Sequence, residues 1–203
     1  MRYSAAKKIL LPFFRNKYKE INGLENLPLK RPYLIAINHV DYLDGFFVSL
    51  AFEKTKKQDV YFLSKTNNYW WSAATLPIDP NDKTKSLKQA IDYLKSGKII
   101  CNFIEGQRNH ENNLQEGKTG TVRMALAAQV PVIPIGIISK IHKNYCQAVF
   151  DLLSGGHRVI INIGKPLAFE RYYSREISRE LLSELTGQIM RQIVPLCGKT
   201  YPY

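Results

Sequence analysis

The stretch Tyr33–Asp44, which reads YLIAINHVDYLD, constrains the fold of this chain more than any other. Tyr33–Ile37 is short, apolar and introduced by Pro32, which predicts a buried β-strand. The residues from Asp44 to Phe52 are mainly apolar and predict a helix that packs on this strand. His39 then lies at the carboxyl end of a strand, where open α/β sheets carry their ligands and their chemistry.

The spacing of His39 and Asp44 restricts how the two side chains can meet. Residues five apart point about 140° away from each other on an ideal helix, so contact requires His39 in the loop and Asp44 in the first helical turn. A carboxylate at one ring nitrogen fixes the tautomer of a histidine, and the other nitrogen can then accept a proton. Without a serine or cysteine in this stretch, the pair fits a reaction in which a substrate hydroxyl attacks an activated acyl group. The structural alternative is that Asp41 and Asp44 only cap and charge the start of the helix.

Further periodic segments predict the rest of an α/β domain. Apolar, β-branched runs predict strands at 59–64, 99–103, 132–138 and 158–163, and 145–153 is compatible with another strand. Apolar residues at helical spacing predict helices at 84–96, 121–129 and 174–195. Pro134 indicates that its strand lies at an edge or contains a bulge. Strands that alternate with helices predict one domain with a mostly parallel central sheet flanked by helices.

The charge balance indicates an anionic partner. The 203 residues carry a net charge of +12, which suits nucleic acid, an anionic membrane surface or phosphorylated and CoA-like substrates. The three cysteines are widely spaced and form no CxxC motif, which argues against a disulfide framework and for a reducing compartment. Cys101 lies in an apolar run, and we expect it to be a buried thiol.

The first residues form a basic segment around the apolar stretch Ile9–Phe14. No apolar run approaches the about 20 residues needed to span a bilayer, and no small-residue cleavage site follows. We therefore expect residues 1–22 to be a helical, membrane-associating segment and residues 23–203 to be the catalytic domain. An ordinary amphipathic helix packed against the domain is the alternative for residues 1–22.

Ordered motifs across residues 21 to 170 resemble those of the glycerolipid acyltransferases, whose best-known members are the lysophosphatidic acid acyltransferases. Each motif alone is weakly specific, whereas their order along one chain is strongly specific. The matching stretches are Asn38-His39 with Asp44, then Phe103–Arg108 and Val130–Ile135, flanked by Gly23–Pro28, Gly117-Lys118 and Gly164–Pro166.

The resemblance implies that residues 23–203 are an acyltransferase domain, which moves a fatty acyl group from acyl-CoA or acyl-carrier protein to a lysophospholipid hydroxyl in phospholipid biosynthesis. The expected acceptor is 1-acylglycerol 3-phosphate. His39 is then the general base and Asp44 orients it, and backbone N–H groups near His39 or Gly106 are expected to bind the oxyanion. Direct transfer requires no metal and no bound cofactor. The substrate-binding residues implied are Asn38, Lys65, Phe103, Glu105, Gly106, Arg108, Lys118 and Pro134.

One departure from the family pattern leaves the acceptor open. Pro80 stands where the second motif of the family ends in arginine, so glycerol 3-phosphate, another lysolipid and an amino-acid lipid remain alternatives. Arg108 has the structural alternative of an ion pair with Glu105 or Glu111. The resemblance also implies a peripheral or monotopic protein on the cytoplasmic side of a membrane. A non-catalytic lipid-binding protein is a further alternative, as is a basic nucleic-acid-binding protein, although the basic residues are scattered and form no recognisable nucleic-acid module.

Overall fold

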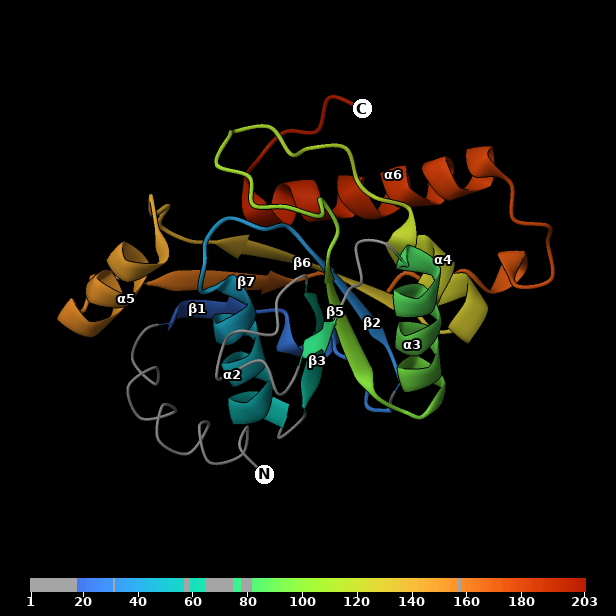
Figure 1. The fold of residues 1–203 in the computed structure, drawn as a ribbon, viewed down its shortest axis with the longest axis horizontal. Helices are drawn as coiled ribbons and strands as arrows, with labels where there is room; N and C mark the ends of the chain where they lie inside the picture. Colours follow the sequence, from blue (N-terminus) through green and yellow to red (C-terminus); the bar gives the residue numbers. More distant parts are fainter. Residues whose placement is uncertain (1–17, 31, 57–58, 65–74, 78–81, 157) are drawn as a thin grey trace.

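Seven strands form one sheet in the computed structural model, in the order β1-β7-β6-β2-β5-β3-β4 (Figure 1). The structure describes residues 18–30, 32–56, 59–64, 75–77, 82–156 and 158–203. Within these residues every neighbouring pair of strands is parallel except β6 with β7. The strands are β1 Tyr18–Asn22, β2 Leu34–Ile37, β3 Val60–Ser64, β4 Thr75–Pro77, β5 Ile99–Phe103, β6 Val132–Ile138 and β7 Val159–Ile163. The predicted α/β fold with a mostly parallel sheet is confirmed.

Helices cover both faces of the sheet (Figure 1). They are α2 Asp44–Lys56, α3 Lys83–Lys95, α4 Gly120–Ala128, α5 Tyr145–Ser154 and α6 Arg179–Cys197, with short 3-10 turns η1 Leu24–Asn26 and η3 Glu170–Tyr172. Leu34 and Ala36 of β2 pack into the core formed with α3, α4 and α6. Ile35 and Ile37 point to the opposite face and pack into the core formed with α2. All four residues of β2 are buried, as expected for a central parallel strand with both faces covered.

Residues 1–22 were predicted to be a helical segment that precedes the domain. For its last five residues the structure differs from this prediction. Tyr18–Asn22 form a strand, β1, that pairs in parallel with β7 at the edge of the sheet. The Tyr18 hydroxyl donates to the carbonyl of Phe47 in α2 at 2.6 Å, and Ile21 packs on the core of that face. The open edge of β7 and these two contacts therefore make this segment part of the domain. Residues 1–17 lie outside the described part of the chain, as do Lys65 and Pro80.

The segment 145–153, compatible with a strand in sequence, is helix α5. Its first turn is capped by Asn144, whose side chain accepts a hydrogen bond from the N–H of Gln147. Ala148 and Leu152, four residues apart, are buried against α2. The helix ends at Gly155, whose φ of 92° is the left-handed conformation that favours glycine.

Pro134 does not mark an edge strand, because β6 lies between β7 and β2. On the side of β7, the N–H and C=O of Val132 both pair with Leu167, and the Pro134 carbonyl accepts from the N–H of Gly164 at 2.8 Å. Backbone directions alternate along a strand, so the nitrogen of Pro134 faces this same side, where the chain bends after β7. Its missing N–H therefore costs no hydrogen bond to β2.

The final helix begins later than its apolar pattern suggests. Ser178 caps α6 by accepting a hydrogen bond from the N–H of Leu181 at 3.1 Å, so the helix starts at Arg179 and not at residue 174. Among the described helices, none combines the length and the apolar character needed to cross a membrane.

Candidate active site

The strands β2 and β5 end side by side, since Ile37 is in register with Phe103. His39 follows the end of β2 by two residues, and Asp44 is the first residue of α2. The His39 Nδ1 atom lies 2.9 Å from Asp44 Oδ2. The contact that the spacing predicted is therefore present in the structure. The Asp44 side chain is fully buried, while 17% of the His39 side chain is exposed.

The carboxylate of Asp44 also organises the loop between the two residues. Its Oδ2 atom accepts the backbone N–H groups of Val40 at 2.6 Å and Asp41 at 2.7 Å. The loop thus wraps around a buried carboxylate, which leaves the pair with little freedom to separate. Among the described residues the second oxygen, Oδ1, is buried and has no hydrogen-bond partner.

The imidazole ring of His39 is stacked on Phe103. The ring centroids are 3.9 Å apart and the planes differ by 19°, and Phe62 stacks on Phe103 in turn at 6.1 Å. With Nδ1 bound to Asp44 and one face covered, the ring has a fixed plane. In the part of the chain that the structure describes, Nε2 has no hydrogen-bond partner. That nitrogen is available to accept a proton.

Glu105 is directed into the protein and not toward an open surface. It is 1% exposed; its Oε1 accepts the backbone N–H of His39 at 3.2 Å, and its Oε2 accepts from the side chain of Asn109 and the N–H of Gln115. The N–H of Asn109 donates to the carbonyl of His39 at 2.7 Å. The loop after β5 therefore holds the His39 peptide at both its N–H and its C=O. Glu105 was predicted to bind the acceptor. In the structure its carboxylate is buried and supports the backbone of His39.

Asn38 and Pro134 are also buried below the site. The side-chain amide of Asn38 donates to the carbonyl of Ile137 at 3.0 Å and accepts from its N–H at 2.8 Å. This side chain extends the pairing of β2 with β6 by one residue and aligns the backbone that enters His39. Both residues were predicted as substrate-binding. The structure shows Asn38 supporting the backbone at the site and Pro134 buried in β6.

Gly106, Arg108 and Lys118 are the exposed members of the predicted set. The Lys118 N–H donates to the carbonyl of Ile104 at 2.8 Å, and a Cβ added to Gly106 would lie 3.5 Å from the Lys118 side chain. The Arg108 guanidinium carbon lies 3.8 Å from the centroid of the Tyr42 ring. Among the described residues Arg108 makes no ion pair, so the predicted alternative with a glutamate is not observed. A guanidinium held by its face keeps its N–H edges available for an anion.

Four of the backbone donors near His39 and Gly106 that could bind the oxyanion are already occupied. The N–H of His39 binds Glu105, and those of Val40 and Asp41 bind Asp44. The N–H of Gly106 donates to the carbonyl of Phe103 at 2.9 Å. An oxyanion at this site therefore needs other donors, and the exposed cations nearby offer N–H groups that these internal contacts do not use.

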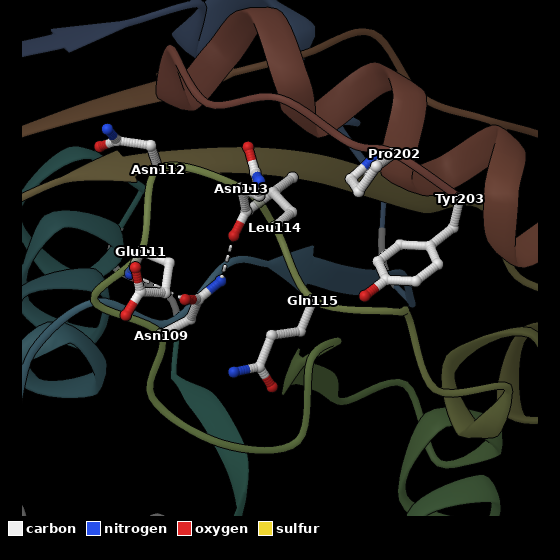
Figure 2. Close-up of a pocket in the computed structure, with 8 residues that line it drawn as sticks. All are labelled: Asn109, Glu111, Asn112, Asn113, Leu114, Gln115, Pro202 and Tyr203. Carbon is white, nitrogen blue, oxygen red and sulfur yellow. Dashed lines mark hydrogen bonds between the residues drawn. The ribbon is translucent and has the colours of Figure 1, made fainter.

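The loop after β5 is braced by the C-terminal residues. The Lys199 ammonium donates to the carbonyls of Asn109 and Glu111, at 3.0 Å and 2.6 Å, and Leu114 and Thr200 are hydrogen-bonded through their backbones. Between the loop and the C-terminal residues lies an open, mainly polar hollow of about 530 Å³, lined by Asn109, Glu111, Gln115, Tyr203 and their neighbours (Figure 2). Asn109, which holds the His39 carbonyl, is thus itself held by Lys199.

A histidine–carboxylate pair lies at the carboxyl end of a mostly parallel sheet, and its open ring nitrogen can accept a proton. The chain belongs to the Acyltransferase family, whose model matches residues 19–138. It is 29% identical over 173 residues to the 1-acyl-sn-glycerol-3-phosphate acyltransferase BAT2, chloroplastic, of Brassica napus, covering 78% of this chain and 46% of that protein. It is 27% identical over 120 residues to the 1-acyl-sn-glycerol-3-phosphate acyltransferase of Escherichia coli strain K12, covering 57% and 47%.

A solved structure has the same fold. The 1-acyl-sn-glycerophosphate (LPA) acyltransferase PlsC from Thermotoga maritima superposes with a TM-score of 0.63 over 96% of this chain and 81% of that chain, at 18% identity. At 18% identity this structural match establishes the fold alone. The chain spans about half the length of the curated relatives it matches.

Proposed function

We propose that this protein transfers a fatty acyl group from a thioester donor, acyl-CoA or acyl-carrier protein, to the hydroxyl of a lysophospholipid. The first candidate for the acceptor is 1-acylglycerol 3-phosphate, since the curated relatives carry that activity in their names. The observation that carries the proposal is the 2.9 Å contact of His39 Nδ1 with a buried Asp44, which leaves Nε2 open.

In the proposed reaction, Nε2 of His39 takes the proton of the acceptor hydroxyl as its oxygen attacks the thioester carbonyl. The buried carboxylate of Asp44 holds the proton-bearing Nδ1 and stabilises the imidazolium that forms. Collapse of the tetrahedral intermediate breaks the C–S bond, and the imidazolium returns the proton to the leaving thiolate. A general base of this kind contributes roughly 10²–10⁴-fold to the rate. The transfer as proposed uses no metal and no bound cofactor.

Arg108 and Lys118 are the proposed anion-binding residues. Both are exposed cationic side chains in the connection between β5 and α4, which holds His39. A phosphate of the acceptor or of the donor suits these side chains, because a guanidinium binds phosphate with two parallel N–H groups and an ammonium binds it as a point charge.

An anionic membrane surface is the proposed site of action. The net charge of +12 favours such a surface, and the acceptor proposed is itself a membrane lipid. The basic segment that contributes to attachment is residues 1–17, because the five residues that follow belong to the sheet. We propose peripheral attachment on the cytoplasmic side.

An assay with a matched pair of histidine variants tests this function. The protein is incubated with labelled palmitoyl-CoA and a panel of acceptors in anionic vesicles, in parallel with the His39→Ala and His110→Ala variants. His110 serves as the control because its side chain is exposed. We expect acylated product from one acceptor, a loss of at least about 100-fold in the His39 variant, and full activity in the His110 variant. Product that survives His39→Ala contradicts the mechanism. If neither acyl-CoA nor acyl-carrier protein yields product with any acceptor, the transferase function is wrong and lipid binding alone is favoured.

A further inference from the structure

A second histidine lies buried beside the loop that carries the general base. His142, in the connection between β6 and α5, is 1% exposed. Its Nδ1 lies 3.1 Å from Asp41 Oδ1 and its Nε2 lies 3.1 Å from Asp151 Oδ2. The backbone N–H of His142 also donates to Asp41 Oδ1, at 3.2 Å. The ring is therefore held between two carboxylates, one from the active-site loop and one from α5.

Both ring nitrogens of His142 are thus used in contacts with carboxylate oxygens. A neutral imidazole has one N–H donor, and its other nitrogen would face the lone pairs of a carboxylate oxygen. Both contacts are attractive when the ring is an imidazolium. Lys140 lies 2.7 Å from the same atom, Asp151 Oδ2. Hydrogen bonds from Lys140 and from His142 lower the pKa of Asp151 below its ordinary value of 3.8.

The contacts of Asp41 lead directly to the general base. Asp41 lies between His39 and Asp44, and its N–H donates to Asp44 Oδ2, the same oxygen that contacts His39 Nδ1. The next residue is anchored in the same way, since the Tyr42 hydroxyl donates to the carbonyl of Lys143 at 3.2 Å. Two successive residues of the loop, Asp41 and Tyr42, are thus hydrogen-bonded to the connection between β6 and α5. These contacts are separate from those that Glu105 makes with His39.

We propose that His142 is a positioning residue for acyl transfer. Its ring and its backbone N–H hold the Asp41 carboxylate, and the loop in turn keeps Asp44 against His39. Its effect on turnover rests on the function proposed above, whereas its effect on the His39 ring does not.

Two amide substitutions separate the contacts of His142. The amide nitrogen of asparagine reaches roughly the place of Nδ1, and that of glutamine roughly the place of Nε2. His142→Asn therefore keeps a donor toward Asp41 and loses the one toward Asp151, while His142→Gln does the reverse. We expect the Gln variant to lose about 10- to 100-fold in kcat with an unchanged KM for the acyl donor. The Asn variant should stay close to the parent protein.

Nitrogen NMR of the imidazole rings gives a second readout that needs no turnover. We expect the His39 signals to move in the Gln variant and to stay in place in the Asn variant. Equal kcat in two folded variants, or His39 signals that do not move in a folded Gln variant, overturns the proposal. If the parent protein transfers no acyl group at all, the proposed function has failed, and the NMR comparison still decides whether His142 positions His39.

Discussion

Four contacts from different parts of the chain fix His39. Asp44 holds Nδ1, Phe103 covers one ring face, Glu105 accepts from the backbone N–H, and Asn109 donates to the backbone carbonyl. Each contact removes a different freedom: ring rotation, ring tilt, and displacement of the peptide in two directions. If His39 is the general base proposed above, this fixed geometry lets it act with little rearrangement, which lowers a reaction barrier.

A substitution at Glu105 distinguishes support of His39 from acceptor binding. The carboxylate accepts three hydrogen bonds, so the amide of Glu105→Gln must turn its N–H₂ toward at least one buried donor. We expect a loss of about 1–3 kcal/mol in the free energy of unfolding, measured by chemical denaturation, together with a lower kcat. Glu111→Gln is the matched control, since that side chain is exposed, and its stability should not change. A Glu105 variant of unchanged stability whose only defect is a raised KM for the acceptor contradicts the supporting role.

At the scale of elements, the backbone of α6 packs directly against Gly136 of β6. A Cβ atom at this position would meet the backbone of α6 at 2.3 Å from the carbonyl carbon of Leu196 and 2.6 Å from the nitrogen of Cys197. Backbone cannot move aside as a flexible side chain can, so the absence of a side chain at Gly136 sets how closely this helix packs on the sheet.

Adding one methyl group at Gly136 tests this packing. We expect Gly136→Ala to cost at least about 1–3 kcal/mol in the free energy of unfolding, because α6 must shift away from the sheet. Gly120→Ala in α4 is the control, as nothing lies within 4 Å of the added Cβ, and alanine in a helix is neutral or slightly stabilising. Thermal or denaturant unfolding of the two variants gives the comparison. Equal stability would mean that α6 does not approach β6 this closely.

For the whole molecule, the net charge of +12 gives a testable consequence. Attachment to anionic vesicles should weaken as salt rises, because the screening length falls from about 10 Å at 0.1 M to about 3 Å at 1 M. Cosedimentation with vesicles of anionic and of neutral lipid, in low and in high salt, measures this. Binding that is equal on both lipids and insensitive to salt contradicts an electrostatic attachment. Salt-sensitive binding to RNA without binding to anionic vesicles would favour the nucleic-acid alternative.

Most of the sheet was predictable because the central strands are mainly apolar. β2 is apolar throughout and β5 is apolar except for Asn102, as expected for strands that are buried on both faces. Cys101 was correctly expected to be buried, and its burial raises the pKa of the thiol well above the usual range. The two edge strands, β1 and β4, and the helix α5 were missed. The open edge of β7 decides β1, and the capping Asn144 together with an apolar contact with α2 decides α5.

The core of the site was predictable for a related reason. His39 and Asp44 are five residues apart, so their contact is a local property of the loop. The supporting contacts are not local: Glu105 is 66 residues from His39, Ile137 is 99 from Asn38, and His142 is 101 from Asp41. No pattern in the neighbourhood of these side chains indicates which distant backbone they meet. Asn38 and Glu105 were therefore predicted to bind substrate, and no role was predicted for His142.

The bracing of the loop after β5 by Lys199 and Thr200 has a consequence during synthesis of the chain. The hydrogen bonds from Lys199 to Asn109 and Glu111 join residues 90 and 88 positions apart, and they cannot form before residue 199 has been synthesised. During synthesis the strands β2 and β5 are complete long before residue 199 leaves the ribosome. A nascent chain therefore contains His39 and Asp44 well before it contains the residues that brace the loop holding His39.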